Sequence, residues 1–172
     1  MKTYILAAFL LFGWFAGVRA QENAMAVKVK EQAMKMHLAM VAGDFKTYVH
    51  FVHPAVVRQA GGEEAMEKGV AGATASMKER GMSFGKYSLG EVSKIWKGGP
   101  EFQCTVFNEL EIKVSGMTIV SKSTLVAISG DGGKNWTFVD NTGRSMASVR
   151  RLLPNLNPAI VFADSDMKMN KN

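Results

Sequence analysis

The sequence of 172 residues contains a single cysteine, Cys104, and no second cysteine with which it could form a disulfide. A reactive thiol needs a neighbouring base or positive charge, and no histidine has an evident reason to approach this position. We therefore expect Cys104 to be a small buried hydrophobic residue rather than a nucleophile.

The sequence also lacks an apolar run of about 20 residues, the length needed to span a membrane. Its longest run, 4–15, follows Lys2 and precedes Val18-Arg19-Ala20, which has small or β-branched residues at the third-last and last positions. This pattern is typical of a secretory signal peptide over residues 1–20. We expect a secreted or periplasmic protein, without a lipoprotein cysteine after the cleavage site and without stable membrane insertion.

Concentrated charge is absent as well. Twenty-one lysines and arginines face 15 aspartates and glutamates, for a net charge of +6, and the basic residues are scattered. Nucleic-acid binding requires a basic patch or stripe, so we expect no nucleic-acid partner. The composition, with 47% apolar residues and no internal repeat, predicts one domain over 21–162, followed by a disordered polar tail over 163–172.

The first half of the mature chain has helical patterns. One helix is expected from Asn23 to Gly43, buried on most sides because it carries two apolar stripes. The stripes are Val27, Met34, Leu38 and Val41, and next to them Val29, Ala33, Met36 and Met40.

Two more helices are expected before Gly81, over 45–51 with Asp44 as N-cap and over 63–80. Between them we expect an extended segment from His53 to Gly61-Gly62, because a residue that precedes proline avoids the helical region.

The second half alternates as strands do. A bent strand, or two short ones, is expected over 83–97, and Glu101–Ser129 reads as two long strands joined by a turn at Ser115-Gly116. In that hairpin the numbers of facing residues sum to 231, so that Cys104 faces Ala127. A last strand over 135–140 and a short helix over 145–153 complete the pattern.

The segment SGDGGKNW, which begins at Ser129, resembles the Asp-box of sialidases, with Asn135 where threonine is usual. Asp-boxes are turns that stabilise hairpins. We expect Asp131 to accept backbone N–H groups and Trp136 to pack beneath the turn.

Three helices, the segment HFVHPAVVRQAGG and a bent antiparallel meander together resemble the nuclear-transport-factor-two-like superfamily. The segments LAMVAGDFKTYVHFVHPAVVRQAGGEEAM, TLVAISGDGGKNWTFVD and RRLLPNLNP look like a secreted bacterial branch of it. The resemblance implies a cone-shaped, cystatin-like α+β fold. About three N-terminal helices would pack on a strongly bent antiparallel sheet with two long central strands and a short C-terminal helix. It implies no particular activity, because the superfamily contains isomerases, dehydratases, polyketide cyclases, transport adaptors and ligand binders.

The apolar face of the predicted hairpin is interrupted where Asn108 falls opposite Ser123, which indicates a pocket floor or a bend. We expect a ligand pocket between this face and the helices, for an apolar small molecule oriented by a few polar groups. The residues expected to line it are Met36, Met40, Tyr48, Phe51, Phe102, Val106, Asn108, Leu110, Ser121, Ser123 and Leu125.

Three functions remain open at this point. We expect a non-catalytic binding or interaction module that uses the pocket or the exposed sheet face. The alternative is a cofactor-free lyase or isomerase, for which His50, His53 and Tyr48 are the candidate acid and base.

The third is a structural homodimer or envelope partner, with a homodimer forming through the sheet face at Phe107, Thr124, Val126 and Ile128. Met36, His37 and Met40 could offer soft ligands to copper(I), but methionines at helical spacing are usually core residues, and we expect neither metal nor cofactor.

Overall fold

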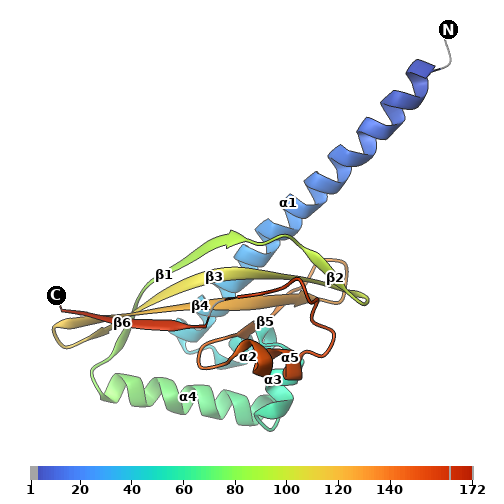
Figure 1. The fold of residues 1–172 in the computed structure, drawn as a ribbon. Helices are drawn as coiled ribbons and strands as arrows, with labels where there is room; N and C mark the ends of the chain where they lie inside the picture. The colour runs from blue at the N-terminus through green and yellow to red at the C-terminus, as the bar shows by residue number, and fades with distance from the viewer. Residues whose placement is uncertain (1–3, 163, 172) are drawn as a thin grey trace.

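The computed structural model describes the backbone of residues 4–162 and 164–171 and the side chains of 21–162 and 164–169. Helices occupy the N-terminal part and are followed by an antiparallel sheet and one short helix, so the expected α+β class is confirmed (Figure 1). The helices are α1 (Tyr4–Ala42), α2 (Phe45–Phe51), α3 (Pro54–Gln59), α4 (Glu63–Glu79) and α5 (Met146–Leu152). The strands are β1 (Ser83–Val92), β2 (Trp96–Gly98), β3 (Glu101–Val114), β4 (Met117–Ser129), β5 (Thr137–Asp140) and β6 (Asp166–Lys171).

The long hairpin of β3 and β4 forms the centre of the sheet, with the register that the sequence predicts. Val114 pairs with Met117, and Cys104 pairs with Ala127. Gly116 has φ +70°, a conformation that glycine adopts without steric cost, so the two-residue turn fixes the register. β1 and β2 pair with the edge of β3 that is opposite β4. β5 and β6 pair with successive parts of β4, along the edge that is opposite β3.

The predicted bend before Gly98 arises from two irregularities in β1. The pairing with β3 shifts between Phe84 and Tyr87 and again between Leu89 and Val92, next to Gly85 and Gly90. Each shift changes the phase of the strand. Phe84, Tyr87, Leu89 and Val92 therefore all lie opposite β3 residues of the same sheet face, although they are spaced by three, two and three positions.

Helix α1 packs one of its two apolar stripes on the inner face of the sheet (Figure 1). Val29, Ala33 and Met36 are buried against β3 and β4, together with Cys104 and Leu125. The prediction that this helix is buried on most sides is wrong. The other stripe faces outward, with exposed fractions of 65% at Val27, 56% at Leu38 and 43% at Val41.

The opposite face of the sheet is covered by α5 and the segment that follows it. Val126 and Ile128 are buried against a cluster that includes Val149, Leu153 and Ile160. The prediction that Val126 and Ile128 belong to an exposed dimer face is therefore wrong, because other segments of the same chain cover both residues. Ser145 caps α5 by accepting a hydrogen bond from the Ser148 N–H, as its position predicts.

Residues 54–59 form α3 instead of the extended segment that was expected. His53 itself is extended, with ψ 134°, but this is the conformation of an N-cap, and Pro54 occupies the first helical turn, where its missing N–H is not needed. The junction of α2 and α3 lies along the free edge of β5. There Val52 bridges to Phe138, and the His53 N–H donates to the Phe138 carbonyl at 2.9 Å.

The expected disorder of the tail is wrong for Asp166–Lys171, which forms β6. This strand pairs with β4 from Met117 to Lys122 and continues the line of β5 along the same edge. Hydrogen bonding to an unpaired strand edge orders this polar segment, a long-range effect that its composition does not reveal.

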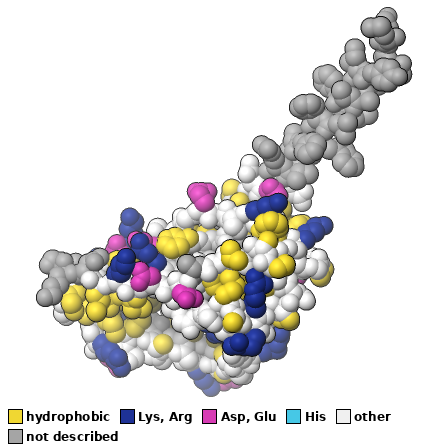
Figure 2. Space-filling model, in the orientation of Figure 1, with side chains coloured by type: hydrophobic (Ala, Val, Ile, Leu, Met, Phe, Trp, Pro, Cys, Tyr) yellow, Lys and Arg dark blue, Asp and Glu magenta, His cyan; other side chains and the backbone are white. Residues whose placement is uncertain are grey.

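Within the part of the chain that the structure describes, no helix combines the length and apolar composition needed to cross a membrane. On the face shown in Figure 2, lysine and arginine side chains lie in several separate places among carboxylates and neutral groups. Hydrophobic side chains gather near the end of the sheet where β6 lies, and Met167 and Met169 are exposed there.

Candidate functional site

A pocket of about 270 Å³ lies between the C-terminal half of α1, the helices α2 to α4 and the inner face of the sheet. Its walls come from every layer of the fold on that side. The lining residues are Met36, His37, Met40, Tyr48, Val52, Val56, Met66, Tyr87, Asn108, Leu110, Leu125, Phe138, Asp140, Thr142 and Arg144.

The structure brings together six of the residues that the sequence predicts for this pocket: Met36, Met40, Tyr48, Asn108, Leu110 and Leu125. Phe51, Phe102 and Val106 do not line it and instead pack in the core cluster of α1 and the sheet. Ser121 and Ser123 are buried but are not among its lining residues.

Asn108 is the polar interruption of the inner face, and it is satisfied by Ser123 as the register predicts. The Asn108 Nδ2 donates to Ser123 Oγ at 2.9 Å, and the Ser123 hydroxyl is 3.1 Å from Asn108 Oδ1. The buried pair avoids the cost of an unpaired polar group, which is about 1–3 kcal/mol. It gives the pocket a fixed polar wall rather than a bend in the strand.

His37 is a lining residue that the pocket prediction did not include. It lies on the sheet side of α1, where its ring stacks on that of Tyr87 with centroids 3.9 Å apart and planes 10° apart. Phe84 meets it edge-on. Burial lowers the pKa of His37, so the imidazole is neutral at pH 7 and adds no positive charge to the pocket.

Two tyrosines and one carboxylate add further polar groups to the pocket. Burial raises the pKa of both Tyr48 and Tyr87, and the negative charge of Asp140 raises both further. Both phenols are therefore protonated at pH 7. Asp140 ends β5, where the Thr142 N–H and hydroxyl each donate to its Oδ1 at 2.7 Å.

The sequence contained a signal that Asp140 lines the pocket, although the pocket prediction did not include it. Phe138 and Asp140 are two residues apart on one strand and therefore share a face of the sheet. Tyr87 could not be placed in the same way, since its side depends on the register shift beside Gly85.

The catalytic candidates His50 and His53 lie outside this pocket. His50 is exposed on α2 and borders a different surface hollow with Lys46 and Glu63. His53 caps α3, accepting the Ala55 N–H at its Nδ1 at 3.2 Å, and faces a separate cavity of about 120 Å³. Of the three catalytic candidates, only Tyr48 lines the pocket.

Cys104 is fully buried, and burial raises its pKa to about 12, as expected of a core residue. Met36, His37 and Met40, the soft-ligand candidates, all line the pocket. Among the described side chains, no group of three or more His, Cys, Asp or Glu residues is placed to hold a metal ion.

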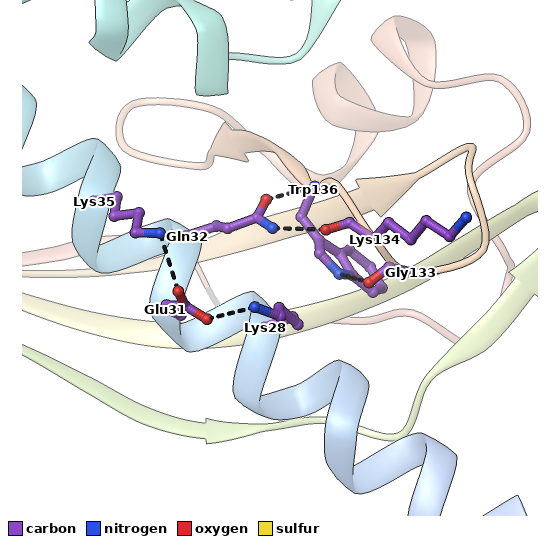
Figure 3. A network of polar contacts seen from close by, with 7 residues as sticks. All are labelled: Lys28, Glu31, Gln32, Lys35, Gly133, Lys134 and Trp136. Carbon is purple, nitrogen blue, oxygen red and sulfur yellow. Dashed lines mark hydrogen bonds and ion pairs between the residues drawn. The ribbon is translucent and has the colours of Figure 1, made fainter.

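Helix α1 is fixed in position by the turn before β5 (Figure 3). The Gln32 side chain donates to the Lys134 carbonyl at 2.8 Å and accepts the Trp136 N–H at 2.7 Å. The Trp136 indole donates to the Gly133 carbonyl at 3.0 Å. Because Met36, His37 and Met40 lie in the turns that follow Gln32, this anchor places them over the sheet.

The Asp-box-like turn has the local role that the sequence predicts. Asp131 accepts hydrogen bonds from the Ser129 hydroxyl and from the N–H groups of Lys134 and Asn135. The N–H and side-chain amide of Asn135 are the largest causes that lower the pKa of Asp131 to about 2. The turn thus holds Trp136 beneath it in the core.

Comparison with models of known protein families, with curated protein sequences and with solved structures found no match.

Proposed function

We propose that this protein is a non-catalytic binding module that takes a small, mainly apolar molecule into the pocket between α1 and the sheet. The observation that supports this most is the pocket itself, bounded by Met36, Met40, Leu110, Leu125 and Phe138. Apolar walls with a few fixed polar groups are the usual composition of a small-molecule site. An apolar cavity of about 150 Å³ holds benzene, so 270 Å³ corresponds to a ligand of about ten non-hydrogen atoms.

We also propose that the fold is of the nuclear-transport-factor-two-like type and that the protein acts after export. The first buried side chain described on α1 is Met25, and Figure 1 shows the earlier part of this helix extending beyond the sheet. Removal of residues 1–20 would leave the described core contacts of α1 intact. N-terminal sequencing of the exported protein tests this, and a chain that retains these residues would contradict it.

Indole, a neutral molecule of nine non-hydrogen atoms, is a suitable probe of the pocket. Amide shifts in a ¹⁵N NMR titration should map to α1, β3 and β5 around Leu125 and Phe138. Leu110→Trp should abolish them because the larger side chain fills the pocket. Val161→Trp adds the same ring at a position that is 73% exposed and should leave them unchanged.

Binding of indole at another surface, or equal binding by Leu110→Trp with an unchanged urea midpoint, would contradict the proposal. Independently of the probe, non-denaturing mass spectrometry of the natively exported protein would identify a natural ligand from its mass.

A further inference from the structure

Asp140 is a carboxylate at the end of β5, on the inner face of the sheet beside apolar positions, and its side chain is exposed to solvent although it lines the pocket. Two residues before it on β5, Phe138 is buried in the core, and its pairing partner Leu125 is buried in the same core. All three line the pocket. Among the described side chains, Asp140 forms no ion pair, and its only hydrogen-bond partner is Thr142, in the turn that follows.

The walls near Asp140 are aromatic and polarisable. Tyr48, Tyr87 and Phe138 present rings to the pocket, and Met36 and Met40 line it from α1. The faces of aromatic rings carry negative charge density and attract cations. The charge of Asp140 acts on both tyrosines, so carboxylate and rings belong to one electrostatic environment.

One described cation, Arg144, also lines the pocket. Its guanidinium donates to Gln59 Oε1 at 3.3 Å, which directs at least one of its N–H groups toward the C-terminus of α3. His37 is neutral and does not add to this charge.

We propose that the ligand of this pocket is a small organic cation, an amine with an apolar body, whose ammonium group pairs with Asp140 beside the rings of Tyr48 and Tyr87. This inference rests on the proposed function and adds the chemical class of the ligand. The apolar body would lie against Leu110, Leu125 and the methionines.

Three probes of similar size and different charge test it at pH 7: 2-phenylethylamine, 2-phenylethanol and phenylacetate, each titrated calorimetrically. We expect the amine to bind at least about threefold more tightly than the alcohol, a modest gain because an ion pair with an exposed carboxylate contributes little. Asp140→Asn should reduce amine affinity to that of the alcohol while keeping the turn, because an amide oxygen still accepts from Thr142. Asp166→Asn, which removes an exposed carboxylate outside the pocket, should change nothing.

Equal affinity for amine and alcohol, unaffected by Asp140→Asn, would overturn this inference and leave pocket binding in place. Tightest binding of phenylacetate, lost in Arg144→Gln, would overturn it in favour of an anionic ligand. If none of the three probes binds, and indole also fails to bind, the inference and the proposed function both fail.

Discussion

Gln32 on α1 and Trp136 before β5 are joined by a 2.7 Å hydrogen bond, although 104 positions separate them in the sequence. The same side-chain amide donates to the Lys134 carbonyl, so one residue satisfies two backbone groups of the turn. Helix α1 is thereby tied to β5, the strand that carries the pocket residues Phe138 and Asp140.

Replacing Gln32 by alanine should lower the free energy of unfolding by about 1–3 kcal/mol, because the buried Trp136 N–H and the Lys134 carbonyl lose their partner. Urea denaturation followed by circular dichroism measures this. The matched control is Glu31→Ala on the neighbouring position, which removes only exposed ion pairs to Lys28 and Lys35 and should have little effect. Equal losses from both variants would contradict the role of Gln32.

Gly133→Ala should destabilise the protein by at least about 1–2 kcal/mol. Gly133 has φ +86°, which is unfavourable for other residues, and an added Cβ would overlap the Met25 side chain. Gly130→Ala is the control, because that position has no left-handed φ and open space around it. Met25→Ala should relieve the steric part only, so the double variant Met25→Ala/Gly133→Ala should show a favourable coupling energy in a urea-denaturation cycle.

The low pKa of Asp131 predicts an acid-sensitive turn. The folded-state value of about 2 lies below the ordinary value of 3.8, so the ionised carboxylate is favoured by folding. Its contribution is complete above about pH 5 and is lost progressively as the pH falls through 3.8 toward 2. Urea midpoints at pH 5 and pH 2.5 should therefore differ less in Asp131→Asn than in the wild type. An identical pH dependence of the two proteins would show that the turn does not depend on the charge.

The sequence predicted the centre of the fold well because local chemistry determines it. A two-residue turn ending in Gly116 fixes which residues of β3 and β4 face each other, and this placed Asn108 opposite Ser123. The same reasoning failed for α1, where two apolar stripes were available. The pattern does not indicate which stripe packs on the sheet. The buried side of the helix also includes two polar residues, Gln32 and His37, which a search for apolar residues does not find.

The pocket could be predicted only where it depends on regular elements. Leu110 and Leu125 follow from the hairpin register, whereas Tyr87 depends on a register shift in β1. Arg144 depends on the loop after β5, whose position is set by long-range packing. Phe51, Phe102 and Val106 are apolar residues at the correct face or helix but pack in the core, because periodicity gives a direction and not the depth of a cavity.

His53 should make α3 sensitive to mild acid. Its Nδ1 accepts the Ala55 N–H only when unprotonated, and burial lowers its pKa below the ordinary 6.5. The neutral form is thus favoured in the folded state. Its stabilising contribution is present above pH 6.5 and is lost as the pH falls through the folded-state pKa.

Asparagine is a good N-cap that does not titrate, so the free energy of unfolding of the wild type relative to that of His53→Asn should fall between pH 7.5 and pH 5. His37, whose pKa burial also lowers, is present in both proteins, so its own titration cancels. Thermal melts at several pH values measure the difference, and a constant difference would rule out this role for His53.

The pairing of β6 with β4 makes a final prediction about the sheet edge. A chain that ends after Phe162 lacks this strand, so the β4 segment from Met117 to Lys122 loses its neighbour on that side. Exposed strand edges exchange their amide protons rapidly and promote association. We expect hydrogen exchange to be at least about tenfold faster for the amides of 117–122 that bond to β6.

The same experiment contains its own reference, because β4 residues 125–128 still pair with β5 and should keep their protection. Met169→Lys is a second control. It changes a side chain that is 74% exposed without removing the strand, and should leave exchange in 117–122 unchanged. Unchanged exchange in the shortened chain would mean that β6 contributes nothing to this edge in solution. Faster exchange confined to 117–122 would show that the polar C-terminal segment is part of the sheet.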